Sequence, residues 1–371
     1  MRVRWSPDAP RPVALVRRGF SPTGGAEKFL ARFAAAAAKT GRHLVLVTDR
    51  PWPEEARVGM PQTVLRGKTP GAFAASVARW RKTWGDGIVF SFERLQGADC
   101  YRAGDGVHVA WMRRRREYDP AVHVLLRRIS GKHRDLVRLE KNCFSAAHTG
   151  AVIVNSLLVR EEIERIYGYP AARIHLVRNG VPEDYAAGVP GKREARRLLG
   201  LPETGFVAAF AGTGWKRKGL RYAIAALDRA GLSDAKLAVA GRGRRPALSG
   251  PGVVFLGPLR DVRPLLSAAD AFILPTVYDP FSNACLEALA VGRPVITSAA
   301  NGCAEIIREG ITGSVVQRPD AIGGLATALE YWARDGRAAA AEADCREAAA
   351  ACSLAENVRC TLEILEGIGK G

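Results

Sequence analysis

The sequence predicts an α/β protein built from two Rossmann-like domains, each a doubly wound parallel sheet. Short apolar runs alternate with helical patterns along all 371 residues, as in βαβ units, whose parallel strands need crossover helices. The chain is also about twice as long as a common domain of roughly 100–200 residues, so two cores are expected. Ligands of such sheets bind at the carboxyl ends of the strands, and two facing sheets form a cleft there.

The first half contains the elements of one such domain, expected over residues 1–178. A helix is predicted at Ala26–Ala38. Continuous apolar runs are typical of strands that are buried on both faces. The runs in this half are Pro12–Val16, His43–Val47, Ile88–Phe90, Ala151–Val154 and Ile174–Val177.

The second half repeats the pattern over residues 179–353, after a boundary segment at Asn179–Lys192 that is rich in Pro and Gly. An Ala-rich helix is predicted at Ala338–Ala351, because Ala has the best helix propensity. The last helix, Leu354–Glu366, lies in residues 354–371, which we expect to pack back on the first domain. The strands predicted here are Phe206–Phe210, Lys236–Ala240, Val253–Leu256, Ala271–Leu274 and Pro294–Thr297, and the helices are Leu220–Ala230, Val262–Ala268 and Asn283–Ala290.

The charge balance points to an anionic partner. The formal net charge is +18, and such a surface attracts polyanions by long-range steering. Nucleic acid, an anionic membrane leaflet and a phosphorylated acceptor are the candidates, and a coding bias toward Arg and Ala is the alternative source of the charge.

The cysteines and the N-terminus exclude several classes. Seven cysteines without CxxC spacing indicate neither a disulfide framework nor a zinc site, and no metal or other cofactor is expected. The N-terminal residues lack the apolar core of a signal peptide. No stretch approaches the ~20 apolar residues of a membrane span. We therefore expect a cytoplasmic protein, with peripheral association at the inner face of the cytoplasmic membrane as a further expectation.

The segment Leu274–Pro294 has the pattern of an anion site. A buried strand ends in a turn, and a helix is predicted to begin at Ser282 or Asn283, whose side-chain oxygens suit a helix cap. Free amides and the helix dipole at such a start favour phosphate. Asp279 precedes this helix, and Glu287 lies one turn inside it. The spacing of these two acids alone fits equally well an Asp in an ordinary turn and a Glu on the solvated face of a helix.

This segment resembles the donor-binding motif of the family 4 glycosyltransferases, which have the GT-B fold. Their motif has two acids separated by seven residues, with Pro-Phe after the first acid and Ala after the second. Here these are Asp279-Pro280-Phe281 and Glu287-Ala288. The first acid is usually Glu, so Asp279 is a departure. The resemblance implies that Asp279 contacts the transferred sugar, that Glu287 contacts the ribose, and that amides of Phe281, Ser282 and Asn283 meet the diphosphate.

A second match is the glycine turn Phe210–Gly219, which contains Gly212 and three adjacent cations. Cations in such a turn suit phosphate, and a solvated basic loop is the alternative. The family has a Lys-Gly pair here, matched by Lys218-Gly219. It also often has an Arg five residues earlier, where this chain has Thr213. Lys216 or Arg217 is expected to supply the missing cation.

A third match lies between the first strand and its helix, where Gly24 and Gly25 allow a close backbone approach. The resemblance implies that they face the donor phosphates and the acceptor. It further implies a retaining, metal-independent hexosyltransferase that takes a nucleotide sugar, for which UDP is our expectation. The nearest type extends the lipopolysaccharide core, so a glycan or glycolipid acceptor of the cell envelope is expected.

Two regions of the first half are candidates for acceptor binding. Asp105 and His108 lie in a predicted Gly-rich loop, Tyr101–Trp111, where a catalytic role and a plain surface position both remain open. The basic stretch at 111–141 follows, and it is either a solvated face or a contact for a phosphorylated glycolipid or anionic leaflet. Its cations are Arg113, Arg114, Arg115, Arg116, Arg127, Arg128, Lys132, Arg134, Arg138 and Lys141.

Three other functions are alternatives for such a sequence. A nucleic-acid-binding protein needs stacking aromatics among its cations, whereas aromatics are only 7% of this chain, so no nucleic-acid partner is expected. An NAD-dependent enzyme needs GxGxxG after the first strand, where this chain has Gly24-Gly25-Ala26-Glu27. A sugar-nucleotide epimerase of the GT-B fold stays open as an alternative.

Overall fold

The computed structural model describes residues 10–21, 25–121, 131–246, 250 and 252–368. The chain divides into two compact units. Unit 1 is Met1–Arg178 together with Leu354–Gly371, and unit 2 is Asn179–Ser353. No helix among the described residues is long and apolar enough to cross a bilayer.

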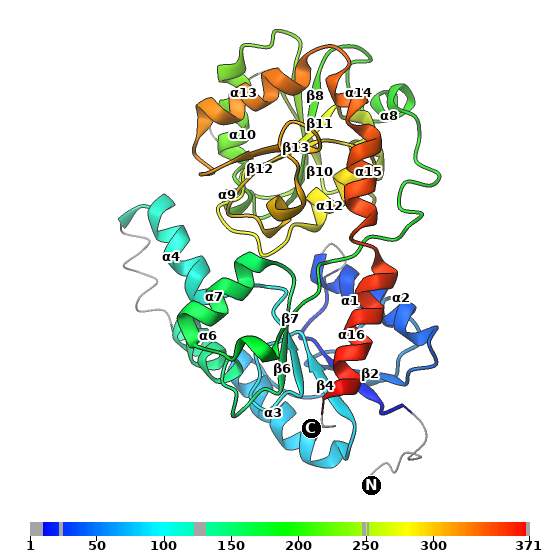
Figure 1. Ribbon diagram of the computed structural model, residues 1–371, viewed down its shortest axis with the longest axis vertical. Coiled ribbons are helices and arrows are strands. Elements are labelled where there is room, and N and C mark those ends of the chain that lie inside the picture. Colours follow the sequence, from blue (N-terminus) through cyan, green and yellow to red (C-terminus); the bar gives the residue numbers. More distant parts are fainter. Residues whose placement is uncertain (1–9, 22–24, 122–130, 247–249, 251, 369–371) are drawn as a thin grey trace. The chain divides into compact units, whose positions relative to one another are not determined.

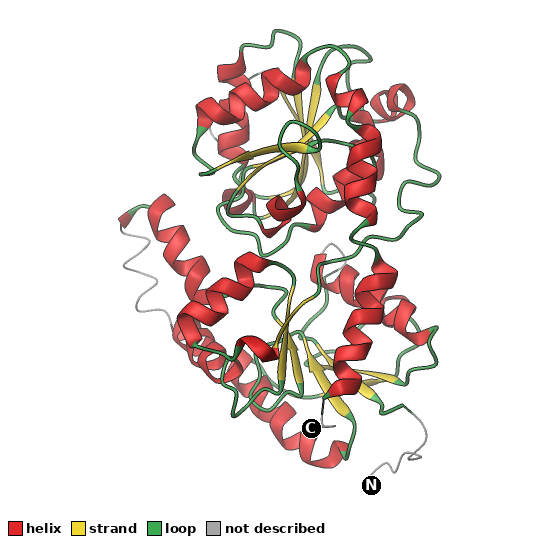
Figure 2. Ribbon diagram, viewed as in Figure 1, coloured by secondary structure: helices red, strands yellow, loops and turns green. Residues whose placement is uncertain are grey.

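Unit 1 is a parallel seven-stranded sheet in the order β3-β2-β1-β4-β5-β6-β7 (Figures 1 and 2). Its strands are β1 Val13–Val16, β2 Leu44–Thr48, β3 Gln62–Val64, β4 Ile88–Ser91, β5 Cys100–Arg102, β6 Ala151–Val154 and β7 Ile174–Leu176. Its described helices of at least one α-turn are α1 Gly25–Ala38, α2 Glu54–Arg57, α3 Pro70–Trp84, α4 His108–Tyr118, α6 Gly131–Cys143, α7 Leu157–Tyr167 and α16 Leu354–Gly367.

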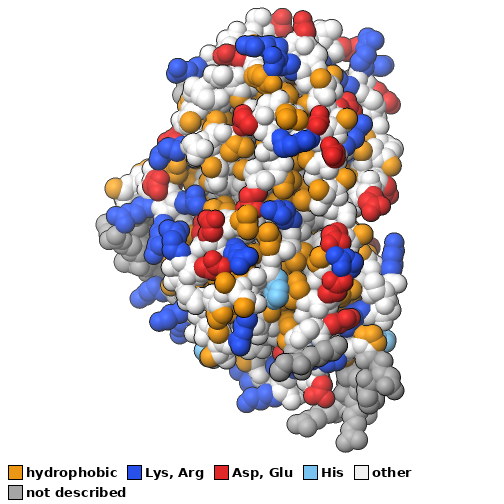
Figure 3. Space-filling model, in the orientation of Figure 1, with side chains coloured by type: hydrophobic (Ala, Val, Ile, Leu, Met, Phe, Trp, Pro, Cys, Tyr) orange, Lys and Arg blue, Asp and Glu red, His pale blue; other side chains and the backbone are white. Residues whose placement is uncertain are grey.

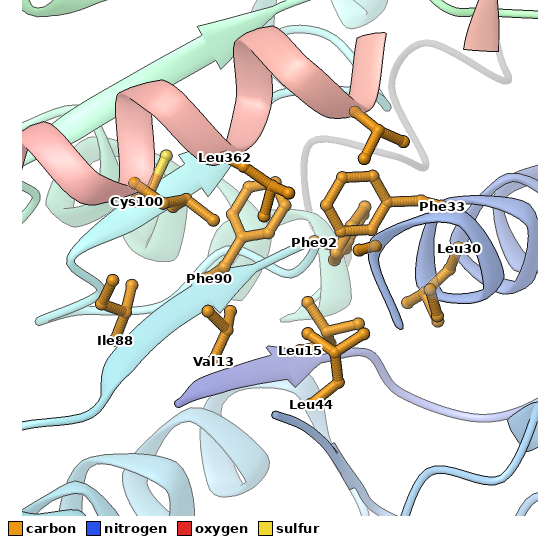
Figure 4. Close-up of a cluster of buried hydrophobic side chains, with 14 of the residues drawn as sticks. Val13, Leu15, Leu30, Phe33, Leu44, Ile88, Phe90, Phe92, Cys100 and Leu362 are labelled. Atoms are coloured by element: carbon orange, nitrogen blue, oxygen red, sulfur yellow. The ribbon is translucent and has the colours of Figure 1, made fainter. Parts of the chain in front are cut away.

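The last helix, α16, belongs to the core of unit 1. It contacts α1, and Leu362 faces Phe90 and Phe33 in a cluster of buried side chains (Figure 4). An ion pair between Arg42 and Glu366 adds to this packing. Burial of these large apolar groups, at about 25 cal/mol per Å², is what holds the end of the chain to this unit.

Unit 2 is a parallel six-stranded sheet in the order β10-β9-β8-β11-β12-β13 (Figure 1). Its strands are β8 Val207–Thr213, β9 Lys236–Arg242, β10 Val253–Gly257, β11 Ala271–Leu274, β12 Val295–Ser298 and β13 Gly313–Val316. Its α-helices are α8 Lys192–Leu198, α9 Trp215–Lys218, α10 Leu220–Ala230, α11 Arg263–Ala268, α12 Asn283–Ala290, α13 Ile322–Ala333, α14 Arg337–Ala340 and α15 Glu342–Ala350. Two parallel sheets with helical crossovers confirm the predicted fold class.

Two local predictions were wrong. The Ala-rich segment forms two helices, α14 and α15, with Ala341 between them. Propensity is a weak prior that tertiary contacts override, and α15 packs on α12 and places Glu342 3.3 Å from Arg293. The predicted loop at 101–111 is also more ordered, since it contains the end of β5 and the start of α4.

Candidate functional site

The candidate donor-site residues predicted for the second half gather at the carboxyl edge of the sheet of unit 2. β8, β11 and β12 are neighbours in that sheet and run parallel. Their carboxyl ends therefore meet at one edge, which is where ligands of open α/β sheets bind. The basic turn at α9 follows β8, and the acidic turn before α12 follows β11.

Lys218 and Asp279 form an ion pair at this edge. Lys218 Nζ donates a hydrogen bond to Asp279 Oδ2, and both side chains are buried, with residue exposures of 8% and 6%. Burial alone would raise the pKa of the Asp279 carboxyl, but the charges of Lys218 and Arg217 lower it below its ordinary value of 3.8. Asp279 is therefore a carboxylate at neutral pH.

Arg217 is the second cation of this cluster. Its Nη1 donates to the Tyr278 carbonyl at 2.9 Å and lies 3.6 Å from Asp279 Oδ2. Its own carbonyl accepts from Val277 N at 2.8 Å and from Thr276 Oγ1 at 3.0 Å. The α9 turn is thus fastened to the segment after β11, and two cations face one carboxylate there.

Glycines allow the two turns to approach each other. Gly219 has a φ of 80°, and a Cβ at this position would lie 1.9 Å from the Pro275 carbonyl oxygen. Gly212, near the end of β8, lies against the aliphatic part of the Lys218 side chain. A Cβ added at Gly212 would lie 3.5 Å from that side chain. A larger residue at Gly219 cannot enter this turn without moving the backbone.

The start of α12 differs in detail from the prediction. Ser282 occupies the cap position, but its side chain makes no cap hydrogen bond. Instead Asn301 Oδ1 accepts from Ser282 N and from Cys303 N, each at 3.1 Å. A cap from a distant segment satisfies the orphan amide, and Ser282 Oγ is left buried without a hydrogen-bond partner among the described residues.

The other donor-site residues predicted for this unit lie around the same helix. Phe281 is buried, and its carbonyl accepts from Asn179 Nδ2 at 3.2 Å. Asn179 Nδ2 also donates to Asn283 Oδ1 at 2.6 Å. Glu287 lies one helical turn beyond Asn283 and is half-buried. Asn179 and Asn301 were not among the predicted site residues, because their contacts join segments far apart in the chain.

The predicted acceptor residues lie in unit 1. Asp105 is exposed, and its Oδ2 is 3.4 Å from Nη1 of Arg17. Arg17 follows β1 directly and also pairs with Glu27 and Glu93. Burial raises the pKa of the Glu93 carboxyl, a shift that the charge of Arg17 opposes. Sequence reasoning missed Arg17, although its place directly after a buried strand is a usable signal.

His108 is not in a loop but is the first residue of α4. Its Nε2 lies 3.2 Å from Nδ1 of His133, and the two rings stack with centroids 5.3 Å apart. Gly25 is the first residue of α1, and Gly24 lies outside the described residues.

The basic stretch at 111–141 is divided between α4 and α6, and Arg127 and Arg128 lie outside the described residues. Some of its cations are paired within the protein. Arg114 contacts Glu162 at 3.2 Å, and Arg115 contacts Asp119 at 2.7 Å. On the face of the molecule drawn in Figure 3, Lys and Arg side chains are exposed in the region where Figure 1 places α4 and α7.

Two family models match the chain. The Glycosyltransferase Family 4 model matches residues 23–185, and the Glycosyl transferases group 1 model matches residues 204–335. These ranges lie over unit 1 and unit 2 respectively.

Curated relatives are also glycosyltransferases or related synthases. An uncharacterized glycosyltransferase of Methanocaldococcus jannaschii is 31% identical over 49% of this chain and 51% of its own length. The α-maltose-1-phosphate synthase of Mycobacterium tuberculosis is 30% identical over 45% and 48%. The chain thus spans about half the length of these two relatives. The D-inositol 3-phosphate glycosyltransferase of Mycobacterium tuberculosis is 27% identical over 88% of this chain and 76% of its own.

Solved structures share the fold over nearly the whole chain. WaaG, a glycosyltransferase involved in lipopolysaccharide biosynthesis, matches with a TM-score of 0.79 and 21% identity, over 97% of this chain and 100% of its own. HepE of Anabaena, solved with UDP and glucose, matches with a TM-score of 0.73 and 17% identity, over 96% and 100%. At these identities the likeness shows the fold.

Proposed function

The chain belongs to the family 4 glycosyltransferases of the GT-B fold, and from this premise we propose that it moves a hexose from a nucleotide sugar to a glycan or glycolipid acceptor. The observation that carries the proposal is the buried Lys218–Asp279 pair beside the start of α12. Two cations, an acid and a helix start at one sheet edge suit a sugar diphosphate.

Cleavage of the sugar C1–O bond leaves negative charge on the departing diphosphate. In this proposal Lys218, Arg217 and the dipole at the start of α12 stabilise that charge, and such electrostatic stabilisation is the largest single term in many enzymes. Of the three amides expected to meet the diphosphate, the Ser282 amide already donates to Asn301 Oδ1. The buried Ser282 hydroxyl adds a donor at the same helix start. With these groups in place, the proposed reaction takes no metal ion or other cofactor.

The two acids take different parts of the donor in this proposal. Asp279 meets the hydroxyls of the transferred sugar, and Glu287, one turn inside α12, meets the ribose. The acceptor hydroxyl attacks C1 from the face that the diphosphate leaves, so the configuration at C1 is retained, and an oxygen of the departing phosphate takes the hydroxyl proton. Gly212 lets the β8 turn come close to the phosphates.

We propose UDP as the nucleotide and a cell-envelope saccharide, such as lipopolysaccharide core, as the acceptor. The fold is shared with HepE, solved with UDP and glucose, and with WaaG, involved in lipopolysaccharide biosynthesis. Asp105 and His108 in unit 1 are the proposed contacts of the acceptor hydroxyl. The reaction would take place in the cytoplasm, at the inner face of the cytoplasmic membrane.

The donor site is tested first by nucleotide binding. A nucleotide at roughly 100 times its dissociation constant stabilises the protein that binds it by about 2.7 kcal/mol. UDP, ADP and GDP are compared by thermal shift on the wild type, Lys218→Ala and Glu287→Ala. We expect UDP to shift the wild type and neither variant. A protein that no nucleotide shifts has no such donor site, and release of UDP without any sugar acceptor would favour the epimerase.

Contact with an anionic membrane through the basic 111–141 region is a separate part of the proposal. Cations near such a surface contribute about 1 kcal/mol each, and α4 carries four consecutive arginines, Arg113–Arg116. We expect sedimentation with phosphatidylglycerol vesicles at low salt and its loss at high salt. Equal sedimentation with phosphatidylcholine vesicles would rule this contact out.

A further inference from the structure

Glu140 is a fully buried carboxylate whose two oxygens are both occupied. It lies on α6 and has no exposed surface. Its Oε2 accepts from His108 N at 2.5 Å and from Arg94 Nε at 2.9 Å. Its Oε1 accepts from Val109 N at 3.0 Å and from the Tyr167 hydroxyl at 2.6 Å. Four donors from three places in the chain thus converge on one side chain.

Two of these donors are the first two amides of α4. The residue at the cap position, Val107, makes no side-chain cap hydrogen bond. Glu140, 32 residues away in the chain, supplies the missing acceptor. A carboxylate at this place satisfies orphan amides and complements the positive end of the helix dipole. The start of α4, and with it His108, is therefore fixed by α6.

The same cluster holds the loop that precedes α4. Arg94, which pairs with Glu140, also donates from Nη2 to the Gly106 carbonyl at 2.7 Å. On the other side, Asn155 Nδ2 lies 3.4 Å from the Gly104 carbonyl oxygen. Asp105 stands between these two anchored carbonyls and is held at its own side chain by Arg17. The loop is thus held by residues that follow three strands of the sheet, namely Arg17 after β1, Arg94 after β4 and Asn155 after β6.

Burying a carboxylate in the core costs free energy of desolvation. The desolvation of an ion pair often cancels its attraction, and a well-packed apolar residue is as stable or more so. A buried carboxylate that is fully paired does, however, permit one geometry only, because every alternative leaves a charged group or an amide unsatisfied. The hydrogen bonds around Glu140 therefore restrict the loop to one conformation, and they add little to the free energy of unfolding.

We infer that Glu140, acting with Arg94, is a positioning residue for sugar transfer: it fixes the loop that presents Asp105 and His108. This inference rests on the proposed function, in which that loop meets the acceptor. Glu140 touches no substrate. It acts through the backbone of residues 106–109, whose carbonyl and amides it and Arg94 hold.

The test uses the whole chain and Glu140→Gln, which keeps the shape but turns one acceptor into a donor. Hydrogen exchange at residues 104–109 is expected to rise about ten-fold, because a buried amide loses its partner. Exchange in α12 and the affinity for UDP stay as in the wild type. Tyr167→Phe is the matched control, since it removes one donor to Glu140 that is not part of the loop, and it should leave residues 104–109 protected.

Activity supplies the second readout. With UDP-glucose as donor and core-truncated lipopolysaccharide as acceptor, kcat over KM for the acceptor should fall about ten-fold in Glu140→Gln, at an unchanged KM for the donor. Unchanged exchange at 104–109 overturns the inference, and so does raised exchange with unchanged acceptor kinetics. Arg94→Lys, which keeps the charge but cannot reach both Glu140 and Gly106, serves if the Gln variant does not fold. Failure of the proposed function looks different, because the wild type then neither binds UDP nor transfers sugar.

Discussion

Lys218 Nζ donates a hydrogen bond to Asp279 Oδ2, and this buried pair joins the turn after β8 to the turn after β11. The two residues are 61 positions apart in the chain. Asp279 thereby acts as the counter-ion of Lys218, and Arg217 stands beside it as a second cation. The arriving diphosphate would share these cations with a carboxylate that is already there.

Replacement of Lys218 by Ala should weaken UDP binding by roughly ten-fold to a hundred-fold, since hydrogen bonds to charged groups contribute about 1.5–3 kcal/mol. Titration calorimetry measures this directly. Lys236→Ala is the matched control, because Lys236 lies at the amino end of β9, at the opposite edge of the sheet. Equal affinities of Lys218→Ala and wild type would contradict a role for Lys218 at the phosphates.

Asp279→Asn should destabilise unit 2 by about 3 kcal/mol at neutral pH, because it leaves a buried cation without its partner. The pKa of Asp279 is lowered in the folded protein. Its contribution is therefore present above the ordinary pKa of 3.8 and is lost as the pH falls through the folded value. Urea unfolding of both proteins should show a difference that shrinks below about pH 4. Asp184→Asn, at an exposed position of the same unit, should show neither effect.

Gly219→Ala should cost roughly 2–4 kcal/mol, because the new Cβ would meet the Pro275 carbonyl oxygen at 1.9 Å in a residue with a φ of 80°. Gly231→Ala is a control for the backbone strain alone, since Gly231 has a φ of 62° and open space around it. We expect about 1 kcal/mol there. Denaturant unfolding compares the two, and similar losses would mean that the close approach at Gly219 relaxes freely.

Arg196→Met should destabilise unit 2 by about 3–5 kcal/mol. Arg196 is buried, pairs with Asp270 at 2.8 Å, and donates to the Ala268 carbonyl at 2.9 Å. Without the Arg196 guanidinium, the Asp270 carboxylate and the Ala268 carbonyl each lose a hydrogen-bond donor. Arg193→Met, one turn away and exposed, removes only a surface pair with Glu203 and should cost less than about 1 kcal/mol. Unfolding midpoints in urea decide between these values.

Much of the fold was predictable from the sequence, because strands that are buried on both faces have continuous apolar runs in the sequence. The predicted run Ala271–Leu274 is β11, and Leu220–Ala230 is α10, with the same bounds. The strands that were not predicted, β3, β5 and β13, have three or four residues each. These three segments, QTV, CYR and GSVV, contain polar residues or Gly, so they lack the continuous apolar run by which the other strands were predicted.

The sequence by itself determined the fold class and the motifs of the candidate site, because strand burial, glycine turns and the spacing of Asp279 and Glu287 are local features of the chain. Only the tertiary structure decided which groups meet. It paired Lys218 with Asp279, brought Asn301 rather than the Ser282 side chain to the start of α12, and set Glu140 against the first amides of α4. Caps and ion pairs of this kind join segments far apart in the chain, and their formation depends on how the sheet aligns the ends of its strands.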